Sequence, residues 1–383
     1  MQYCFLNKMI RVLDLSLLLP GPYCARIMAD FGAHVIKVER PDQGDWVRSV
    51  PPFKDGISTL FLALNRGKYS LTLDLKTPAG REIFLEFAAR ADVLLETFRP
   101  GVMENLDLGY EQLAHSNPRL VYCSLTGFGP QGTYRDRPGH DLNYIALSGL
   151  LDLTGTTDGP PAIPGGQIAD VGGALWAVVG IQQALLARHL TGRGQRVDCS
   201  LLGSALSMLP IAAARETGEQ PMARGTSDLT GGWVCYQVYA TNDGKYMTLG
   251  ALEPKFWEFF CQTVSRDDLI NQQFAPAVPG EPVYEQLRAL FLSRTQAQWL
   301  DTFKNVDTCC EPVYSLSEAL TSEPVQALGM LAEEGLLPPV QFSAQEYTPS
   351  GHAPALGEHT GELLAEFGYT ADQISALKAQ GVV

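Results

Sequence analysis

Residues 10–41 read IRVLDLSLLLPGPYCARIMADFGAHVIKVERP and contain the first complete structural unit of the chain. A short apolar run, 10–15, predicts a strand. Pro20 and Pro22 favour the first turn of a helix that ends near Gly32. Residues 34–39 alternate in side-chain character with period two and predict a second strand. A strand, a helix and a strand in this order form the unit from which parallel sheets are built.

The same alternation continues through the first 200 residues. Thr77 is placed to cap a helix that begins at Pro78, and a long apolar helix is expected over 170–190. Further strands are predicted at 69–75, 91–96, 120–125 and 196–200. We therefore expect an α/β fold with a doubly wound parallel sheet, in which loops at the carboxyl ends of the strands carry function.

The composition and the periodicity of the sequence change after residue 200. Residues 201–232 are predicted to form a linker, because 215–232 are polar and glycine-rich with little periodicity. Residues 233–315 are expected to form a small α+β domain. Its predicted elements are a hairpin of strands 234–240 and 245–250 around Thr241-Asn-Asp-Gly244, then helices at 254–264, 281–292 and 296–305. Residues 316–383 are expected to hold a second linker and two short helices, starting at Thr360 and Thr370.

Composition limits the classes of partner. The 383 residues are 45% hydrophobic and 18% charged, which is typical of globular proteins, and the net charge is −14. This charge argues against nucleic acid and against an anionic membrane surface as partners. Residues 1–138 carry 16 basic and 15 acidic side chains, whereas the remainder carries 12 and 27, so the first third is the favoured place for any anionic ligand. Basic residues near predicted strand ends form either a rim for a phosphorylated ligand or a solvated face: Arg40, Arg66, Lys68, Lys76 and Arg99.

Cysteine usage and the amino terminus predict a cytoplasmic protein. Apart from the adjacent pair Cys309-Cys310, the eight cysteines lie far apart and have no zinc-like spacing, which predicts free thiols in a reducing cytosol and no metal site. Lys8 and Arg11 interrupt the amino-terminal stretch, so no signal peptide is expected. The longest apolar stretch, 174–186, is expected to be too short to span a bilayer.

Three acidic or basic side chains are candidates for chemistry. His140 lies where a polar loop turns into an apolar helix expected over 145–151, and a histidine there either exchanges protons or caps the helix. Asp170 opens the long helix either as its N-cap or as a functional carboxylate beside a ligand that approaches Gly172 and Gly173. Glu253 precedes the first turn of a helix, as a poor cap or as a functional group.

Together, several stretches resemble CoA-transferase family III (CaiB/BaiF). They include LLETFRPGVMENLDLGY at 94–110, NPRLVYCSLTGFGPQG at 117–132 and ADVGGALWAVVGIQQALLARHLTGRGQ at 169–195. Two motifs, GHDLNY at 139–144 and GALEP at 250–254, resemble the α-methylacyl-CoA racemase branch in particular. The resemblance extends from about residue 10 to 367 and covers almost the whole chain.

The resemblance implies an interlocked homodimer, with a Rossmann-like large domain built from both chain ends and a small α+β domain. It implies an acyl-CoA substrate and no separate cofactor, since coenzyme A is part of that substrate. His140 and Asp170 would be the acid/base pair that inverts the α-carbon of a 2-methylacyl-CoA thioester through an enolate. Glu253 would assist from the small domain, with Asp141 as a second candidate for orienting the histidine.

The same resemblance suggests the residues that bind coenzyme A. Its adenine and phosphates would lie against Arg40, Leu73, Asp74, Leu75, Lys76 and Arg99. Its pantetheine end would lie near Gly139, Asn143 and Tyr144. Donors for the enolate oxygen are expected from the backbone of Gly172 and Gly173. In the transferase branch of the family, Asp170 would instead be a nucleophile that forms an acyl anhydride and then an enzyme–CoA thioester, moving CoA between carboxylic acids.

Overall fold

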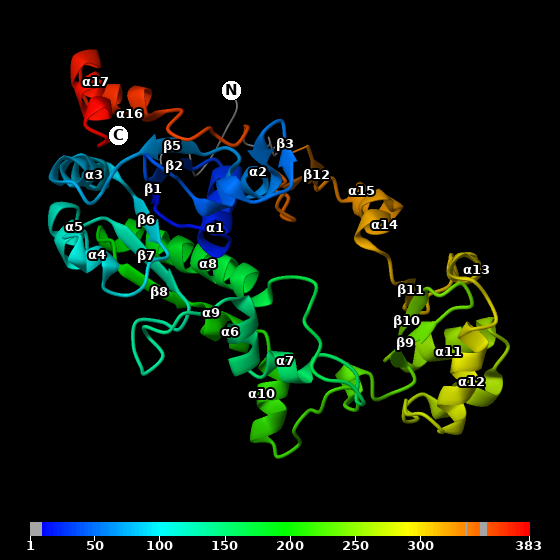
Figure 1. The fold of residues 1–383 in the computed structure, drawn as a ribbon. Coiled ribbons are helices and arrows are strands. Elements are labelled where there is room, and N and C mark those ends of the chain that lie inside the picture. The colour runs from blue at the N-terminus through cyan, green and yellow to red at the C-terminus, as the bar shows by residue number, and fades with distance from the viewer. Residues whose placement is uncertain (1–9, 334, 345–350) are drawn as a thin grey trace. The chain divides into compact units, whose positions relative to one another are not determined.

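The computed structural model describes residues 10–333, 335–344 and 351–383. The chain divides into two compact units, traced in Figure 1. Unit 1 takes in residues 1–148, 166–208 and 324–383, so it combines segments from both ends of the chain. Unit 2 takes in residues 149–165 and 209–323.

Unit 1 is built on a six-stranded parallel sheet in the order β5-β2-β1-β6-β7-β8. Its strands are β1 (Arg11–Asp14), β2 (His34–Glu39), β5 (Tyr69–Thr72), β6 (Val93–Glu96), β7 (Val121–Thr126) and β8 (Arg196–Ser200). The predicted doubly wound α/β fold is confirmed. The strand order reverses between β1 and β6, and in such sheets ligands bind outside the carboxyl ends of the strands at this reversal.

Helices cover both faces of the sheet (Figure 1). On one face, α1 (Pro20–Asp30) packs against α8 (Ile168–Thr191), and α8 packs against β7, β8 and α9 (Leu201–Ser207). On the other face, a buried core joins strand residues such as Leu13, Ile36 and Leu71 to the helices that follow β5 and β6 and to the carboxyl-terminal helices. Those helices are α3 (Pro78–Arg90), α4 (Val102–Asn105), α5 (Tyr110–Ser116), α16 (Thr360–Glu366) and α17 (Ala371–Ala379).

The carboxyl-terminal segment is tied to the edge strand β5 of the same unit. The Thr72 N–H donates to Thr360 Oγ1 at 3.0 Å, and the Asp74 N–H donates to the Val382 carbonyl at 2.8 Å. Smaller elements complete unit 1: η1 (Trp46–Ser49), β3 (Phe53–Lys54), β4 (Ile57–Ser58), α2 (Thr59–Asn65), α6 (Asp141–Leu147), β12 (Leu331–Ala332) and β13 (Gly335–Leu336).

α8 is 24 residues long, and by length and composition alone it could cross a membrane, the one such helix in the described part of the chain. The expectation that this stretch is too short was therefore wrong. The helix extends beyond 174–186 on both sides, from Ile168 to Thr191. A core helix passes the same test, and α8 packs against α1, β7, β8 and α9.

Unit 2 holds a three-stranded antiparallel sheet in the order β11-β10-β9, which confirms the predicted hairpin. The strands are β9 (Tyr236–Ala240), β10 (Tyr246–Gly250) and β11 (Cys310–Pro312). A core that includes several aromatic side chains joins this sheet to α11 (Pro254–Thr263), α12 (Pro282–Phe291) and α13 (Gln296–Phe303). Other elements of unit 2 are α7 (Leu150–Leu153), α10 (Pro210–Thr217), η2 (Asp228–Thr230), η3 (Asp267–Gln272) and α14 (Leu316–Thr321), and α15 (Glu323–Ala327) begins at its end.

Three expectations about element boundaries need correction. The predicted linker at 201–232 contains α9 and α10, because the Ser200 side chain caps α9 and Pro210 opens α10. The division between the units falls after residue 208 rather than after 200, and again after 323. The helix expected over 145–151 starts earlier, at Asp141, and is broken where Gly149 adopts a φ of 85°. Among the described residues all seven cysteines are free thiols, as predicted.

Candidate active site

The GHDLNY motif forms the start of α6. His140 is its N-cap residue, with an extended backbone (φ −125°, ψ 173°), and its N–H donates to Asn143 Oδ1 at 2.9 Å. The imidazole is exposed, so it is available to a ligand. Tyr144 is buried behind it, and Gly139 is required there because a Cβ at that position would lie 2.9 Å from the tyrosine ring. The motif thus presents an exposed histidine on a rigid, aromatic support.

Asp141 joins α6 to the start of α8. Its Oδ1 accepts hydrogen bonds from the N–H groups of Ala169 at 2.7 Å and Asp170 at 3.1 Å. These are first-turn N–H groups, which have no acceptor within the helix itself. Asp170 is therefore not the N-cap of α8, which is Gln167, and that structural explanation of Asp170 was wrong. The carboxylate that caps α8 comes from a residue 29 positions earlier in the chain.

Asp170 lies in the first turn of α8 with its carboxyl group partly buried. Burial, followed by the negative charge of Asp141, raises its pKa to about 6, while the nearby His140 opposes the rise. Burial, followed by the charge of Asp170, raises the pKa of the Tyr144 hydroxyl to about 12. The structure thus brings His140, Asp141, Tyr144 and Asp170 together, and it gives Asp170 a pKa suited to proton transfer near neutrality.

Gly172 and Gly173 do not have the role expected for them. α8 begins at Ile168, so both glycines lie beyond the first turn, where N–H groups bond within the helix. Both are buried beside α9: a Cβ at Gly172 would lie 2.7 Å from Met208 Cε, and one at Gly173 would lie 2.4 Å from Leu201 Cδ2. They permit close packing of α8 and α9 rather than close approach of a ligand.

Glu253 belongs to unit 2, whereas the four residues above belong to unit 1. It is the N-cap residue of α11, with an exposed side chain that accepts no capping hydrogen bond. Its carbonyl accepts from the N–H groups of Phe256 at 3.1 Å and Trp257 at 3.3 Å in the first turn of α11. The exposed Glu253 carboxylate accepts no hydrogen bond from the first turn of α11, so it is available for another contact.

The positions expected to bind coenzyme A are of three kinds. Arg40, Lys76 and Arg99 are exposed, although Arg40 pairs with Asp42 at 2.7 Å. Leu73 is buried, and its N–H donates to the Glu39 carbonyl at 2.8 Å. Asp74 and Leu75 are partly buried beside the chain terminus, Asn143 lies on α6, and Gly139 directly precedes its N-cap residue. Only the exposed arginines and Lys76 can offer charge to a phosphate without rearrangement.

Two members of the predicted basic rim are internal. Arg66 is 1% exposed and pairs with Asp30 at 2.8 Å, and Lys68 is 3% exposed and pairs with Asp14 at 2.8 Å. The prediction that they line a ligand rim was wrong. Their partners come from β1 and α1, distant in sequence, so local patterning could not place them inside.

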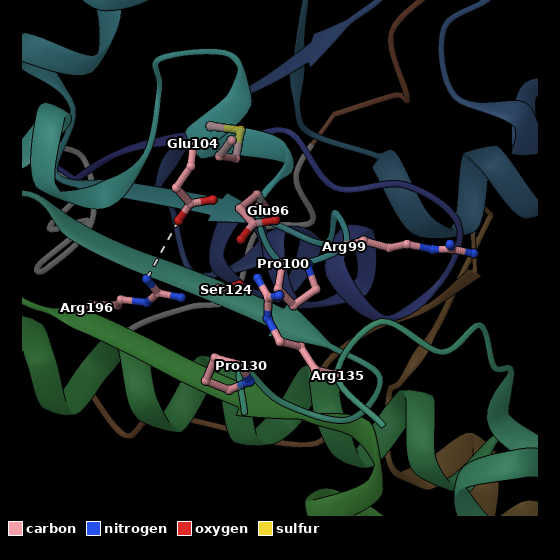
Figure 2. Close-up of a pocket in the computed structure, with 10 residues that line it drawn as sticks. Glu96, Arg99, Pro100, Glu104, Ser124, Pro130, Arg135 and Arg196 are labelled. Carbon is pink, nitrogen blue, oxygen red and sulfur yellow. Dashed lines mark ion pairs between the residues drawn. The ribbon is translucent and has the colours of Figure 1, made fainter. Parts of the chain in front are cut away.

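A cavity of about 180 Å³ lies where β6 and β7 end (Figure 2). Its lining combines Arg99, Arg135 and Arg196 with Glu96 and Glu104. Burial raises the pKa of Glu96 to about 7, against hydrogen bonds from Ser124 and the Phe98 N–H that favour the charged form. Arg135 was not predicted as a site residue. Its place in a polar loop after β7 is the one signal that could have suggested it.

The chain matches CoA-transferase family III over residues 8–360. It is 36% identical to the α-methylacyl-CoA racemase of Homo sapiens, over 98% of this chain and 96% of that protein. It is 34% identical to the succinyl-CoA:glutarate CoA-transferase of Mus musculus, over 98% of this chain and 89% of that protein. A CAIB/BAIF family protein from Brucella suis has a similar structure, with a TM-score of 0.81, 30% identity and coverage of 93% of this chain and 98% of that one. The chain belongs to CoA-transferase family III.

Proposed function

We propose that the protein is an α-methylacyl-CoA racemase, which inverts the carbon beside the thioester by removing its proton on one face and returning a proton on the other. The observation that carries the proposal is that His140, at the start of α6, lies close enough to influence the charge of Asp170, in the first turn of α8, where the carboxyl group has a pKa of about 6. Two racemases, human and mouse, are each 36% identical to this chain.

The proposed reaction moves two protons and forms no covalent intermediate. In one direction the Asp170 carboxylate takes the α-proton, and the thioester becomes an enolate. The imidazolium of His140 then returns a proton to the opposite face, which leaves a carboxylic acid and a neutral imidazole. In the other direction the roles reverse. A carboxyl group whose pKa lies near neutrality serves both directions, because it holds and releases the proton at similar cost.

The other proposed roles depend on position. Asp141 keeps Asp170 in place by capping α8, so it is a positioning residue rather than a proton carrier. Glu253 would assist His140 from unit 2. Arg40, Lys76 and Arg99 would meet the phosphates of coenzyme A, with Arg135 joining Arg99 at the cavity of Figure 2.

The proposal includes a homodimer. α8 leaves apolar side chains exposed in unit 1: Leu175 at 46%, Trp176 at 46%, Val179 at 47%, Leu186 at 57% and Leu190 at 80%. Leu175, Val179, Leu186 and Leu190 follow one another at intervals of four, seven and four residues, which places them along one stripe of the helix. Exposed apolar stripes of this kind mark interaction surfaces, and a second copy of the chain is the proposed partner.

Hydrogen exchange at the α-carbon tests the proposal. A single isomer of 2-methyldecanoyl-CoA is incubated in D2O without any acceptor acid, and deuterium incorporation and configuration are followed. We expect exchange with inversion in the parent enzyme. The Asp170→Asn variant should exchange the α-proton only of the isomer whose α-proton faces His140, and the configuration of that isomer should be retained. The His140→Ala variant should exchange only the other isomer, whose α-proton faces Asp170, again with retention of configuration.

The runner-up function, CoA transfer, predicts a different result. Asp170 would attack the thioester carbonyl, expel the CoA thiolate and form an acyl anhydride; the thiolate would then attack the aspartyl carbonyl and release the carboxylate. The 34% identity to a CoA-transferase is the observation that favours this function. Trapping of an Asp170 hydroxamate by hydroxylamine, with no α-exchange in D2O, would replace the racemase proposal by this one.

A further inference from the structure

The edge strand β5 offers three backbone N–H groups that face away from the sheet. In a strand, alternate residues direct their N–H groups to opposite sides. The Leu73 N–H donates inward, to the Glu39 carbonyl of β2 at 2.8 Å. The N–H groups of Ser70, Thr72 and Asp74 therefore point outward, because β5 is the last strand in the order of the sheet. Groups of this kind on an edge strand are either covered or free to pair with another chain.

The carboxyl-terminal segment covers all three of these groups. Each N–H has an acceptor there: that of Ser70 donates to His359 Nδ1 at 3.2 Å, that of Thr72 to Thr360 Oγ1 at 3.0 Å and that of Asp74 to the Val382 carbonyl at 2.8 Å. Two of the three acceptors are side-chain atoms. A substitution can therefore remove each of these two contacts without changing the backbone.

The third contact lies beyond the strand, on the loop that carries Lys76. β5 ends at Thr72, so Asp74 already belongs to this loop. The loop is closed by its own hydrogen bonds. Asp74 Oδ1 accepts from the Lys76 N–H at 3.0 Å, and the Asp74 carbonyl accepts from the Thr77 N–H at 3.1 Å and the Thr77 hydroxyl at 2.8 Å. A shift at the end of β5 would therefore move Lys76 as well.

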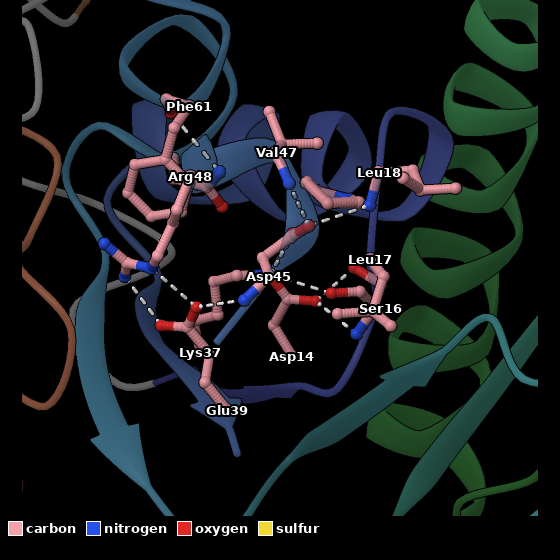
Figure 3. A network of polar contacts seen from close by, with 12 residues as sticks. Asp14, Ser16, Leu17, Leu18, Lys37, Glu39, Asp45, Val47, Arg48 and Phe61 are labelled. Atoms are coloured by element: carbon pink, nitrogen blue, oxygen red, sulfur yellow. Dashed lines mark hydrogen bonds and ion pairs between the residues drawn. The ribbon is translucent and has the colours of Figure 1, made fainter. Parts of the chain in front are cut away.

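The same segment reaches the end of β2, which directly precedes Arg40. Glu39 is buried there and accepts two hydrogen bonds from the Arg48 guanidinium group, at 2.9 and 2.7 Å (Figure 3). Burial acts to raise the pKa of Glu39, but the hydrogen bonds from Arg48 and the charge of Lys37 hold it below its ordinary value, so the group is a carboxylate. Arg48 Nη1 also donates to the Pro354 carbonyl at 3.0 Å. The charged pair thus joins β2 to the carboxyl-terminal segment.

Ser70 connects the two strand ends through its hydroxyl group. This hydroxyl donates to Glu39 Oε2 at 2.9 Å and accepts from the Gly357 N–H at 2.9 Å. Gly357 has a φ of 68°, and a Cβ there would lie 3.0 Å from Thr72 Oγ1, so the close approach of the segment to β5 favours glycine. The segment therefore fixes the end of β5 relative to the end of β2.

We propose that His359 and Thr360 are positioning residues for coenzyme A, which hold the end of β5 so that Lys76 meets a phosphate. The inference rests on the proposed function, in which acyl-CoA is the substrate and Arg40 and Lys76 contact its phosphates. A cover for a sheet edge needs contacts with the strand alone. This segment also contacts the loop beyond β5 and the charged pair at the end of β2, so we assign it to the ligand as well as to the sheet.

Binding of adenosine 3′,5′-bisphosphate, the nucleotide end of coenzyme A, tests the proposal without turnover. Thr360→Val keeps the shape of the side chain but removes the acceptor of the Thr72 N–H, whereas Thr360→Ser keeps the hydroxyl group. Calorimetric titration should show about fivefold weaker binding to Thr360→Val, and less than about a twofold change in Thr360→Ser. The affinity for 2-methyldecanoyl-CoA should fall by the same factor, because the effect lies at the nucleotide.

Two further comparisons show whether the segment acts through the loop. His359→Leu removes the acceptor of the Ser70 N–H, whereas His359→Asn offers an oxygen near the position of Nδ1, so nucleotide binding should weaken in the first variant only. Because Thr360 acts through Lys76, the double variant Thr360→Val with Lys76→Ala should bind no more weakly than Lys76→Ala. A full additional loss in the double variant would contradict this role.

Asn117→Ala is the control for stability. It removes two hydrogen bonds elsewhere in unit 1, to the carbonyls of Ala88 and Ala91, so it should lower the melting temperature and leave nucleotide affinity within about twofold. Unchanged nucleotide affinity in Thr360→Val, or weaker binding of acyl-CoA alone, would overturn the proposal. These titrations do not depend on racemase activity. A parent protein that binds no adenosine 3′,5′-bisphosphate would overturn the assignment of coenzyme A together with this inference.

Discussion

Asp141→Asn should lower the pKa of Asp170 without removing the cap of α8. The parent pKa is raised from 3.8 to about 6, with burial as the largest cause and the Asp141 charge as the second. Asparagine keeps an oxygen to accept from the Ala169 and Asp170 N–H groups but carries no charge. The acid limb of kcat/KM for α-proton exchange should then move down by about 0.5 to 1 pH unit, because the Asp141 charge causes only part of the rise in the Asp170 pKa.

Asp141→Ala is the matched variant, because it removes both the charge and the acceptor. The loss of two hydrogen bonds at a helix start should cost about 2 kcal/mol of unfolding free energy, against well under 1 kcal/mol for Asp141→Asn. The assay is deuterium exchange from pH 4.5 to 8, combined with urea unfolding. An acid limb that does not move in Asp141→Asn, or equal unfolding free energies for the two variants, would refute the reasoning.

Three further predictions concern other parts of the molecule. Glu96 is 5% exposed with its pKa raised from 4.5 to about 7, so the native state binds the proton more tightly than the unfolded chain, and stability falls as pH rises through this window. In Glu96→Gln, the decrease in unfolding free energy between pH 4.5 and 8, measured with urea, should be smaller by up to about 3 kcal/mol. Gly80→Ala should destabilise unit 1 by about 2 kcal/mol or more, because its Cβ would lie 2.1 Å from the Asp74 carbonyl oxygen. Gly361→Ala is the control, since a Cβ at that position meets no neighbouring atom within 4 Å. Equal melting temperatures for the two variants would contradict this prediction. Val179→Glu, on the exposed stripe of α8, should shift sedimentation from dimer toward monomer, and an unchanged dimer would place the interface elsewhere.

Much of the fold follows from local pattern. The predicted strands at 34–39 and 196–200 match β2 and β8 to the residue, because alternation and flanking turns mark both ends. Thr77 caps α3 as expected, accepting from the Gly80 N–H at 3.0 Å. These features depend on residues a few positions apart, which a sequence displays directly.

The expectations that were wrong concern contacts between distant residues. Asp170 looked like a cap because it opens an apolar helix, but the true capping carboxylate is Asp141, from another helix. Gly172 and Gly173 suggested a ligand, whereas the neighbour they accommodate is α9. Lys68 followed a loop and was expected at the surface, but it pairs with Asp14 inside. Tertiary contact decides each of these cases.

The central claim is that an imidazole and a carboxyl group act on one carbon from opposite faces. A crystal structure with 2-methyldecanoyl-CoA bound tests it most directly. The account predicts His140 on one face of the α-carbon and Asp170 on the other, each within about 3–4 Å. Finding both side chains on the same face, or Asp170 aligned instead with the thioester carbonyl carbon, would contradict it.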